Sequence, residues 1–124
     1  MSTYDVAMLG DPAVAVLALE GNIDRDALSR LDESYEQAIV TDPDAVLLDF
    51  SNVGYINSTG IALIVGLLGR ARAEGRRVLA AGLTEHYAHI FTITRLSDFI
   101  QIYDDVEGAV SGADTRPTQE EADT

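Results

Sequence analysis

A strand-to-helix turn near the middle of the chain constrains the fold more than any other feature. Residues 45–50 form an apolar run typical of a buried strand, and residues 61–72 are typical of a helix. The connecting residues 53–61, Val-Gly-Tyr-Ile-Asn-Ser-Thr-Gly-Ile, gather three small polar side chains and a glycine. We expect the hydroxyls at a helix N-terminus, where free backbone N–H groups and the positive end of the dipole favour an added phosphate. This pattern favours a switch over an active site.

The rest of the chain alternates between strand and helix patterns. The order β-β-α-β-α-β-α-β-α predicts one α/β domain with a mixed, mostly parallel sheet, a hairpin of the first two strands, and helices packed on the sheet. Residues 112–124 contain no large apolar side chain, so we expect a disordered acidic tail there. The other predicted strands are 4–9, 13–19, 77–81 and 99–103; the predicted helices are 28–39, 58–74, 86–95 and a last turn or two at 106–110.

Composition and charge exclude several classes of partner. The 124 residues suffice for one core, and acidic residues outnumber basic ones 21 to 8, which gives a net charge of −13. A nucleic-acid binder needs a basic face, so we expect no nucleic-acid partner. The chain has no cysteine, no apolar run long enough to span a bilayer, and no secretory signal at its start. We therefore expect a cytoplasmic protein without direct membrane insertion.

The residues that could carry chemistry are few. His86 and His89 lie on one side of a helix at i, i+3 spacing, but two ligands without another His or Cys are too few for a metal site. No base is assured for Ser58, and the chain has no glycine-rich phosphate-binding motif. We expect no catalytic residue, no metal and no cofactor.

Two further patterns have structural interpretations. Asp49, at the end of a predicted strand, is expected to satisfy local turn hydrogen bonds. Gly66 and Gly69 lie within a predicted helix, where glycine is unfavourable. We interpret them as sites of close packing between that helix and the sheet, in preference to a groove for a partner.

Five segments in a fixed order resemble a known family. Over about residues 14 to 110 the chain is similar to a STAS domain, the family named for sulphate transporters and anti-sigma factor antagonists. The resemblance implies a STAS-type α/β domain over residues 1–111. The segments are 19–24 (Leu-Glu-Gly-Asn-Ile-Asp), 46–50 (Val-Leu-Leu-Asp-Phe), 56–61 (Ile-Asn-Ser-Thr-Gly-Ile), 70–75 (Arg-Ala-Arg-Ala-Glu-Gly) and 94–103.

The resemblance implies a binding switch in place of an enzyme. In similar bacterial proteins, the unphosphorylated form binds an anti-sigma factor that is itself a serine kinase, and a sigma factor is released. Phosphorylation of the turn serine ends the binding, and a serine phosphatase restores it. The chain is then expected to be an anti-sigma factor antagonist in a stress-response pathway, phosphorylated at Ser58; a homodimer is left open. The implied partner-binding residues are Asp24, Asn57, Ser58, Thr59, Gly60 and Ile61, joined by the loop around Thr84.

One residue of the turn departs from the family pattern. Asn57 stands where the family usually has Asp; it can still cap a helix but brings no charge. Two alternatives stay open: an adaptor subunit of a lipid-transport ABC complex that needs no phosphorylation, and a scaffold subunit of a stress-sensing assembly. From the residues alone, Asn57, Ser58 and Thr59 are caps and turn formers.

Overall fold

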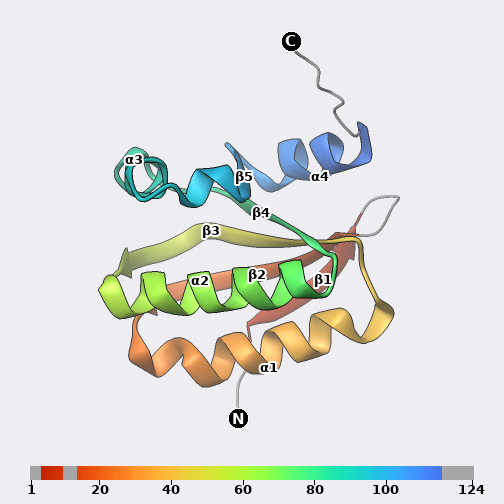
Figure 1. Ribbon diagram of the computed structural model, residues 1–124, viewed down its shortest axis with the longest axis horizontal. Helices are drawn as coiled ribbons and strands as arrows, with labels where there is room; N and C mark the ends of the chain where they lie inside the picture. Colours follow the sequence, from red (N-terminus) through yellow and green to blue (C-terminus); the bar gives the residue numbers. More distant parts are fainter. Residues whose placement is uncertain (1–3, 10–13, 116–124) are drawn as a thin grey trace.

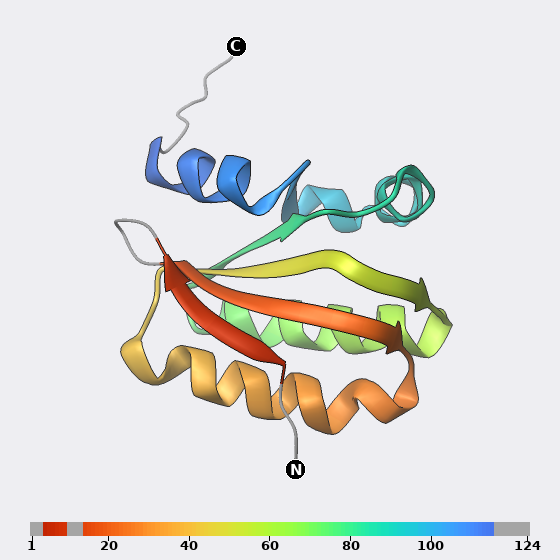
Figure 2. The same ribbon diagram turned by 180° about the vertical axis from the view of Figure 1, so that it is seen from behind.

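One five-stranded sheet runs through the protein. The computed structural model describes residues 4–9 and 14–115, with side chains up to residue 112. The strands lie side by side in chain order, β1 (Asp5–Leu9), β2 (Val14–Ile23), β3 (Ala45–Ile56), β4 (Arg77–Ala81) and β5 (Ile100–Tyr103). The first pair is antiparallel and the other three pairs are parallel, as Figure 2 shows for β1 and β2. The predicted hairpin and mixed sheet are confirmed.

Helices cover both faces of the sheet unequally. Helices α1 (Leu28–Ala38) and α2 (Ser58–Ala73) lie along one face, and α4 (Val106–Thr115) lies on the other (Figure 1). Helix α3 (Glu85–Ile93) contributes Tyr87 and Phe91 to the core beneath α1 and α2. Short 3₁₀ turns connect the elements at Arg25–Ala27, Ile39–Thr41 and Leu96–Asp98.

Alternation along the central strands separates two cores. Leu17 and Leu48 face α1 and α2, whereas Leu47 and Leu79 face Ala109 of α4; all five are fully buried. Because successive side chains of a strand point to opposite faces, a fully apolar strand requires cover on both faces. Within the described residues, no helix is both long and apolar enough to cross a membrane.

Strands β2 and β3 are longer than their apolar runs predict. They continue as a parallel pair to Ile23 and Ile56, which lie opposite each other. The pairing has two register irregularities, one of them next to Gly21 with φ +76°. The polar residues and the glycine of this extension give it a sequence pattern that is typical of a turn. Asp24 and Asn57 follow directly after these two strands. Because the carboxyl ends of β2 and β3 lie side by side, Asp24 and Asn57 lie close together there.

The expected boundary of the tail at residue 112 is wrong. Helix α4 continues to Thr115, past the expected end of the domain at residue 111. Gly112 packs so closely on the ring of Tyr103 that a Cβ there would lie 2.6 Å from the Tyr103 hydroxyl oxygen. Small residues therefore extend the helix by close approach, and this signal is missed when only large apolar side chains are counted. The rest of the expected tail, 116–124, lies outside the described residues.

The far end of α2 is tied to α1 by a polar network. The Tyr35 hydroxyl donates to Glu74 Oε1 at 2.7 Å, and Arg70 pairs with Glu36 at 2.6 Å while its guanidinium lies over the Tyr35 ring. Burial, followed by the hydrogen bond to Glu74, raises the pKa of Tyr35 to about 12. The pKa of Glu74 is lowered, first by the Tyr35 hydrogen bond. Arg76 joins Glu74 to Asp42, so these arginines form no open basic surface.

Candidate functional site

The turn after β3 is held by Asn57. Its backbone is extended, with φ −94° and ψ −178°, and its Oδ1 accepts a hydrogen bond from the Gly60 N–H at 2.8 Å. The Asn57 N–H donates to the Ile23 carbonyl at 3.3 Å, which joins the turn to the end of β2. The neutral amide thus provides the N-cap that an aspartate carboxylate could also provide.

Gly60 allows α2 to approach β2. It is buried, and a Cβ at this position would overlap the carbonyl group of Ile23. Any larger residue would push the first turn of α2 away from the sheet. We therefore assign Gly60, expected as a partner contact, to positioning of the turn. Ile61, expected in the same set, is partly buried and packs against the core beneath α2.

Ser58 and Thr59 are exposed on different sides of the first turn of α2. Thr59 lines a polar hollow of about 310 Å³ together with Asp24, Arg25, Asp26 and Asn57. Ser58 is the first helical residue and is not part of this lining. Its hydroxyl makes no hydrogen bond within the described residues, whereas the cap belongs to Asn57. Ser58 is therefore free of a structural role in the turn.

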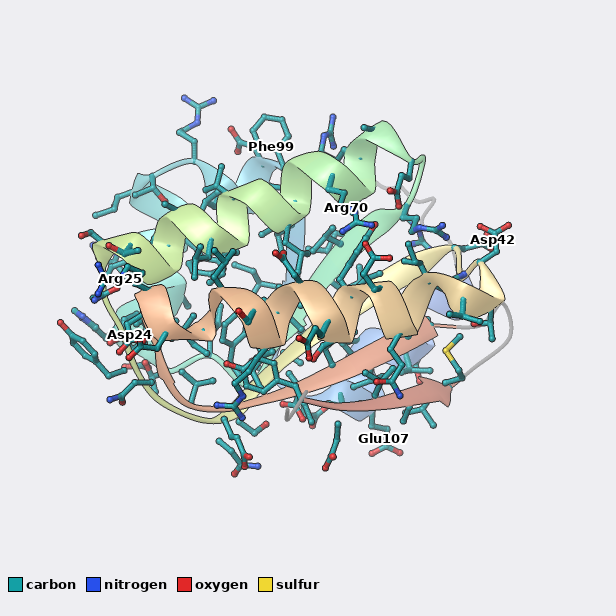
Figure 3. All side chains as sticks on the ribbon, turned by 90° about the horizontal axis from the view of Figure 1, so that it is seen from below. Asp24, Arg25, Asp42, Arg70, Phe99 and Glu107 are labelled. Carbon is teal, nitrogen blue, oxygen red and sulfur yellow. The ribbon has the colours of Figure 1, made fainter. Side chains whose placement is uncertain are left out.

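Asp24 lies beside this turn, as expected. Its Oδ1 accepts from the Asp26 N–H at 3.0 Å and caps the short 3₁₀ turn before α1. Asp24 is half-buried, and Figure 3 shows it with Arg25 at the end of the molecule where α1 and α2 begin. Five of the six expected residues are contiguous in sequence, and the shared end of β2 and β3 brings Asp24 to them.

Tyr87 is a positioning residue that the sequence analysis missed. The Ile56 N–H donates to the Tyr87 hydroxyl oxygen at 2.9 Å in a buried bond, one residue before Asn57. Thr84 caps α3 by accepting from the Tyr87 N–H at 3.3 Å, and Phe91 of α3 meets Phe50 edge to face. The sequence carries no local signal for a bond that spans 31 positions. The local signal that the sequence does carry is Thr84, an N-cap residue that marks the start of α3 three positions before Tyr87.

Other singled-out residues have structural roles or none. The Oδ1 of Asp49 accepts from the Ser51 N–H at 3.0 Å and from its hydroxyl at 2.6 Å, so the predicted local bonds are confirmed. His86 and His89 are both exposed, and no group of three His, Cys, Asp or Glu among the described residues could hold a metal ion.

The packing interpretation of Gly66 and Gly69 is wrong. Both glycines lie on the outer side of α2, and an added Cβ would meet nothing within 4 Å at either position. The buried face of α2 is formed by other residues, among them Ile64 and Leu68. Glycine alone does not reveal which side of a helix it occupies, because the exposed side here is itself largely apolar.

Comparison with known proteins identifies the family. A family model described as "Mlab, STAS domain" matches residues 7–103, which is most of the chain. An anti-sigma-B factor antagonist of Listeria monocytogenes is 32% identical over 92 residues, covering 74% of this chain and 80% of that protein. This protein belongs to the STAS domain family.

The similar proteins include a lipid-transport protein as well as anti-sigma factor antagonists. The intermembrane phospholipid transport system binding protein MlaB of Escherichia coli is 30% identical over 80 residues, covering 64% of this chain and 76% of that protein. The fold matches the anti-sigma factor antagonist SpoIIAA in its unphosphorylated form with a TM-score of 0.68, 16% identity, and coverage of 93% of this chain and 99% of that one. The phosphorylated form of the Bacillus cell fate determinant SpoIIAA matches with a TM-score of 0.67 and 17% identity. The match covers 90% of this chain and 99% of that one.

Proposed function

We propose that this protein is an anti-sigma factor antagonist controlled by phosphorylation of Ser58. The unphosphorylated form binds an anti-sigma factor that is a serine kinase, the kinase phosphorylates Ser58, and a serine phosphatase restores the binding form. The observation that carries the proposal is the exposed Ser58 hydroxyl at the N-terminus of α2, in a turn that is held by other residues. The protein acts as a kinase substrate in the cytoplasm, without catalysis of its own.

A phosphate at this position is compatible with the fold and unfavourable in a complex. At the N-terminus of α2 the helix dipole favours the added charge by about 0.3–1 kcal/mol. Against a partner surface, the same dianion must be desolvated and repels any carboxylate it meets. In the neighbouring hollow, Asp24 and Asp26 outnumber Arg25, so the balance of charge there is already negative. Phosphorylation therefore changes the affinity for the partner while the domain stays folded.

The direct test is the phosphorylation state of the protein isolated from its own host. We expect phosphate on Ser58 by mass spectrometry, and capture of a serine kinase by the unphosphorylated form only. Ser58→Ala is expected to stay bound to the kinase, because without the hydroxyl it cannot be phosphorylated and the complex cannot be released in that way. Phosphate mainly on Thr59, or no phosphate under any growth condition, contradicts the assignment.

The Ser58→Ala variant also checks that Ser58 is dispensable for folding. Asn57 provides the cap, so we expect a free energy of unfolding within about 0.5 kcal/mol of wild type, as for other exposed positions. Urea titration measures it, with Asn57→Ala as the contrasting variant, which loses the cap and about 1 kcal/mol. A large loss in Ser58→Ala would make the serine structural and remove the basis of the switch.

The second candidate is an adaptor subunit of a lipid-transport complex that binds an ATPase subunit without phosphorylation. It is favoured by the similarity to MlaB and by Asn57, which brings no charge to the turn. In that case the protein captures a transport ATPase from the host, and Ser58→Asp and Ser58→Ala bind it equally. Under the antagonist proposal, Ser58→Asp weakens capture of the kinase.

A further inference from the structure

A groove runs along the contact between α1 and α2. It encloses about 270 Å³, and its floor is apolar, formed by Leu28 of α1 and by Ala62, Leu63, Gly66 and Leu67 of α2. Leu28 is 46% exposed although it is a large apolar side chain. The groove begins next to the polar hollow at Thr59 and ends at Arg70, which Figure 3 shows reaching from α2 toward α1. Its length along α2, from Ala62 to Arg70, is about 12 Å, or roughly two helical turns.

The groove contains a glycine that the fold does not need. Glycine in a helix interior lowers helix stability relative to alanine. Gly66 borders the groove, yet a Cβ there would meet no atom of the described chain within 4 Å. No contact inside the described part of the molecule therefore accounts for the absence of a side chain. A neighbour that approaches α2 from outside would account for it, because glycine lets a second backbone or a large side chain come close.

Negative charges outnumber positive ones around the groove. Asp32 lines it and has no hydrogen-bond or ion-pair partner in the part of the chain that is described. Arg70 at the far end is matched by Glu36 and Glu74. At the near end, around the polar hollow, Asp24 and Asp26 outnumber Arg25. An occupant must therefore offer an apolar face together with positive charge.

We propose that the groove between α1 and α2 is a docking site for a basic amphipathic helix of a partner protein. Such a helix places apolar side chains at i, i+3, i+4 and i+7 into a groove of this kind. Its lysines or arginines face Asp32 and the carboxylates at the near end. A second copy of this chain fits poorly, since it brings the same negative charge to the contact. The proposal depends on the groove alone and not on phosphorylation of Ser58.

The test uses a synthetic, fluorescently labelled helical peptide of three to four turns, with leucines at the groove-facing positions and lysines elsewhere. Binding to the full-length protein is measured by fluorescence anisotropy at physiological salt. Gly66→Leu fills the groove and is expected to raise Kd about tenfold or more. Gly69→Leu is the matched control, because Gly69 is also exposed on α2 but does not line the groove; its Kd should stay within about twofold of wild type. Both variants are expected to melt no lower than wild type.

A charge pair provides an independent check. Asp32→Lys is expected to weaken peptide binding about tenfold, whereas Glu33→Lys, the same change one residue along α1 and outside the groove lining, should weaken it much less. The peptide with glutamates in place of lysines should not bind. Equal effects of Gly66→Leu and Gly69→Leu, equal binding of the glutamate peptide, or no binding to wild type each overturn the proposal. Sedimentation that shows a dimer lost only in Gly66→Leu would make the groove a self-interface and also overturn it.

Discussion

Asn57 provides the N-cap of α2 without the negative charge that aspartate would add. A carboxylate at this position would keep the capping oxygen and could also orient the neighbouring hydroxyl toward a kinase. We expect Asn57→Asp to be phosphorylated faster than wild type, while its affinity for the kinase changes by no more than about 1 kcal/mol, as for an exposed charge. Parallel phosphorylation time courses and binding titrations measure both, with Asn52→Asp as a control for charge alone. Equal rates would make the substitution neutral.

Gly60 is the residue of the turn that tolerates substitution least. A Cβ there overlaps the Ile23 carbonyl, so Gly60→Ala must displace the first turn of α2. We expect a loss of about 1–3 kcal/mol in the free energy of unfolding, as for other overpacked sites. Urea denaturation tests this, and Gly54→Ala is the control, since Gly54 in β3 has open space around its Cβ position. A Gly60→Ala variant as stable as wild type would mean that α2 adjusts freely, and the turn would then be less rigid than the packing indicates.

Among the elements, α3 fixes the end of β3 through one hydroxyl. Tyr87→Phe removes the acceptor of the buried Ile56 N–H, and an unsatisfied buried donor costs about 1–3 kcal/mol. We expect faster hydrogen exchange at Ile56 and Asn57, while exchange at the centre of β3 rises only with the global loss of stability. Tyr55→Phe is the matched control, because Tyr55 is 53% exposed. Unchanged exchange at Ile56 would show that β2 alone holds this end of β3.

The helices and strands could largely be predicted from the sequence, and the site could be predicted only in part. Alternation of apolar runs located β4 and α2 almost to the residue, and the turn residues Asn57 and Ser58 followed from the strand–helix boundary. The extensions of β2 and β3 were missed because their polar residues are paired strand to strand, which no local pattern records. The Tyr87 bond and the outward orientation of Gly66 were missed for the same reason: both depend on packing between distant segments.

For the whole molecule, the network between α1 and α2 makes stability fall in alkaline solution. The pKa of Tyr35 is 10.0 in the unfolded chain and about 12 in the folded one, so the unfolded state loses its proton first. The contribution of the neutral Tyr35 hydroxyl to the free energy of unfolding is complete below the pKa of the unfolded state. It is lost as the pH rises from that value through the pKa of the folded state. Urea denaturation over this range should show a fall in wild type that is smaller in Tyr35→Phe. Tyr55→Phe, at an exposed site, should retain the full fall; identical curves for wild type and Tyr35→Phe would contradict the role of Tyr35.

The joint ending of β2 and β3 has a consequence for how sequences of this fold can diverge. Asp24 and Asn57 lie far apart in the sequence, yet each follows a strand whose last residue lies opposite that of the other. Either side chain can therefore be replaced at the cost of one cap, whereas a change in the number of residues in either strand would move the site itself. One deletion in either strand would shift one of them by about 3.3 Å and reverse which face its strand residues occupy. We therefore expect partner choice to evolve through point substitutions at this end of β2 and β3. Insertions and deletions are expected at the other ends of the strands, away from the site.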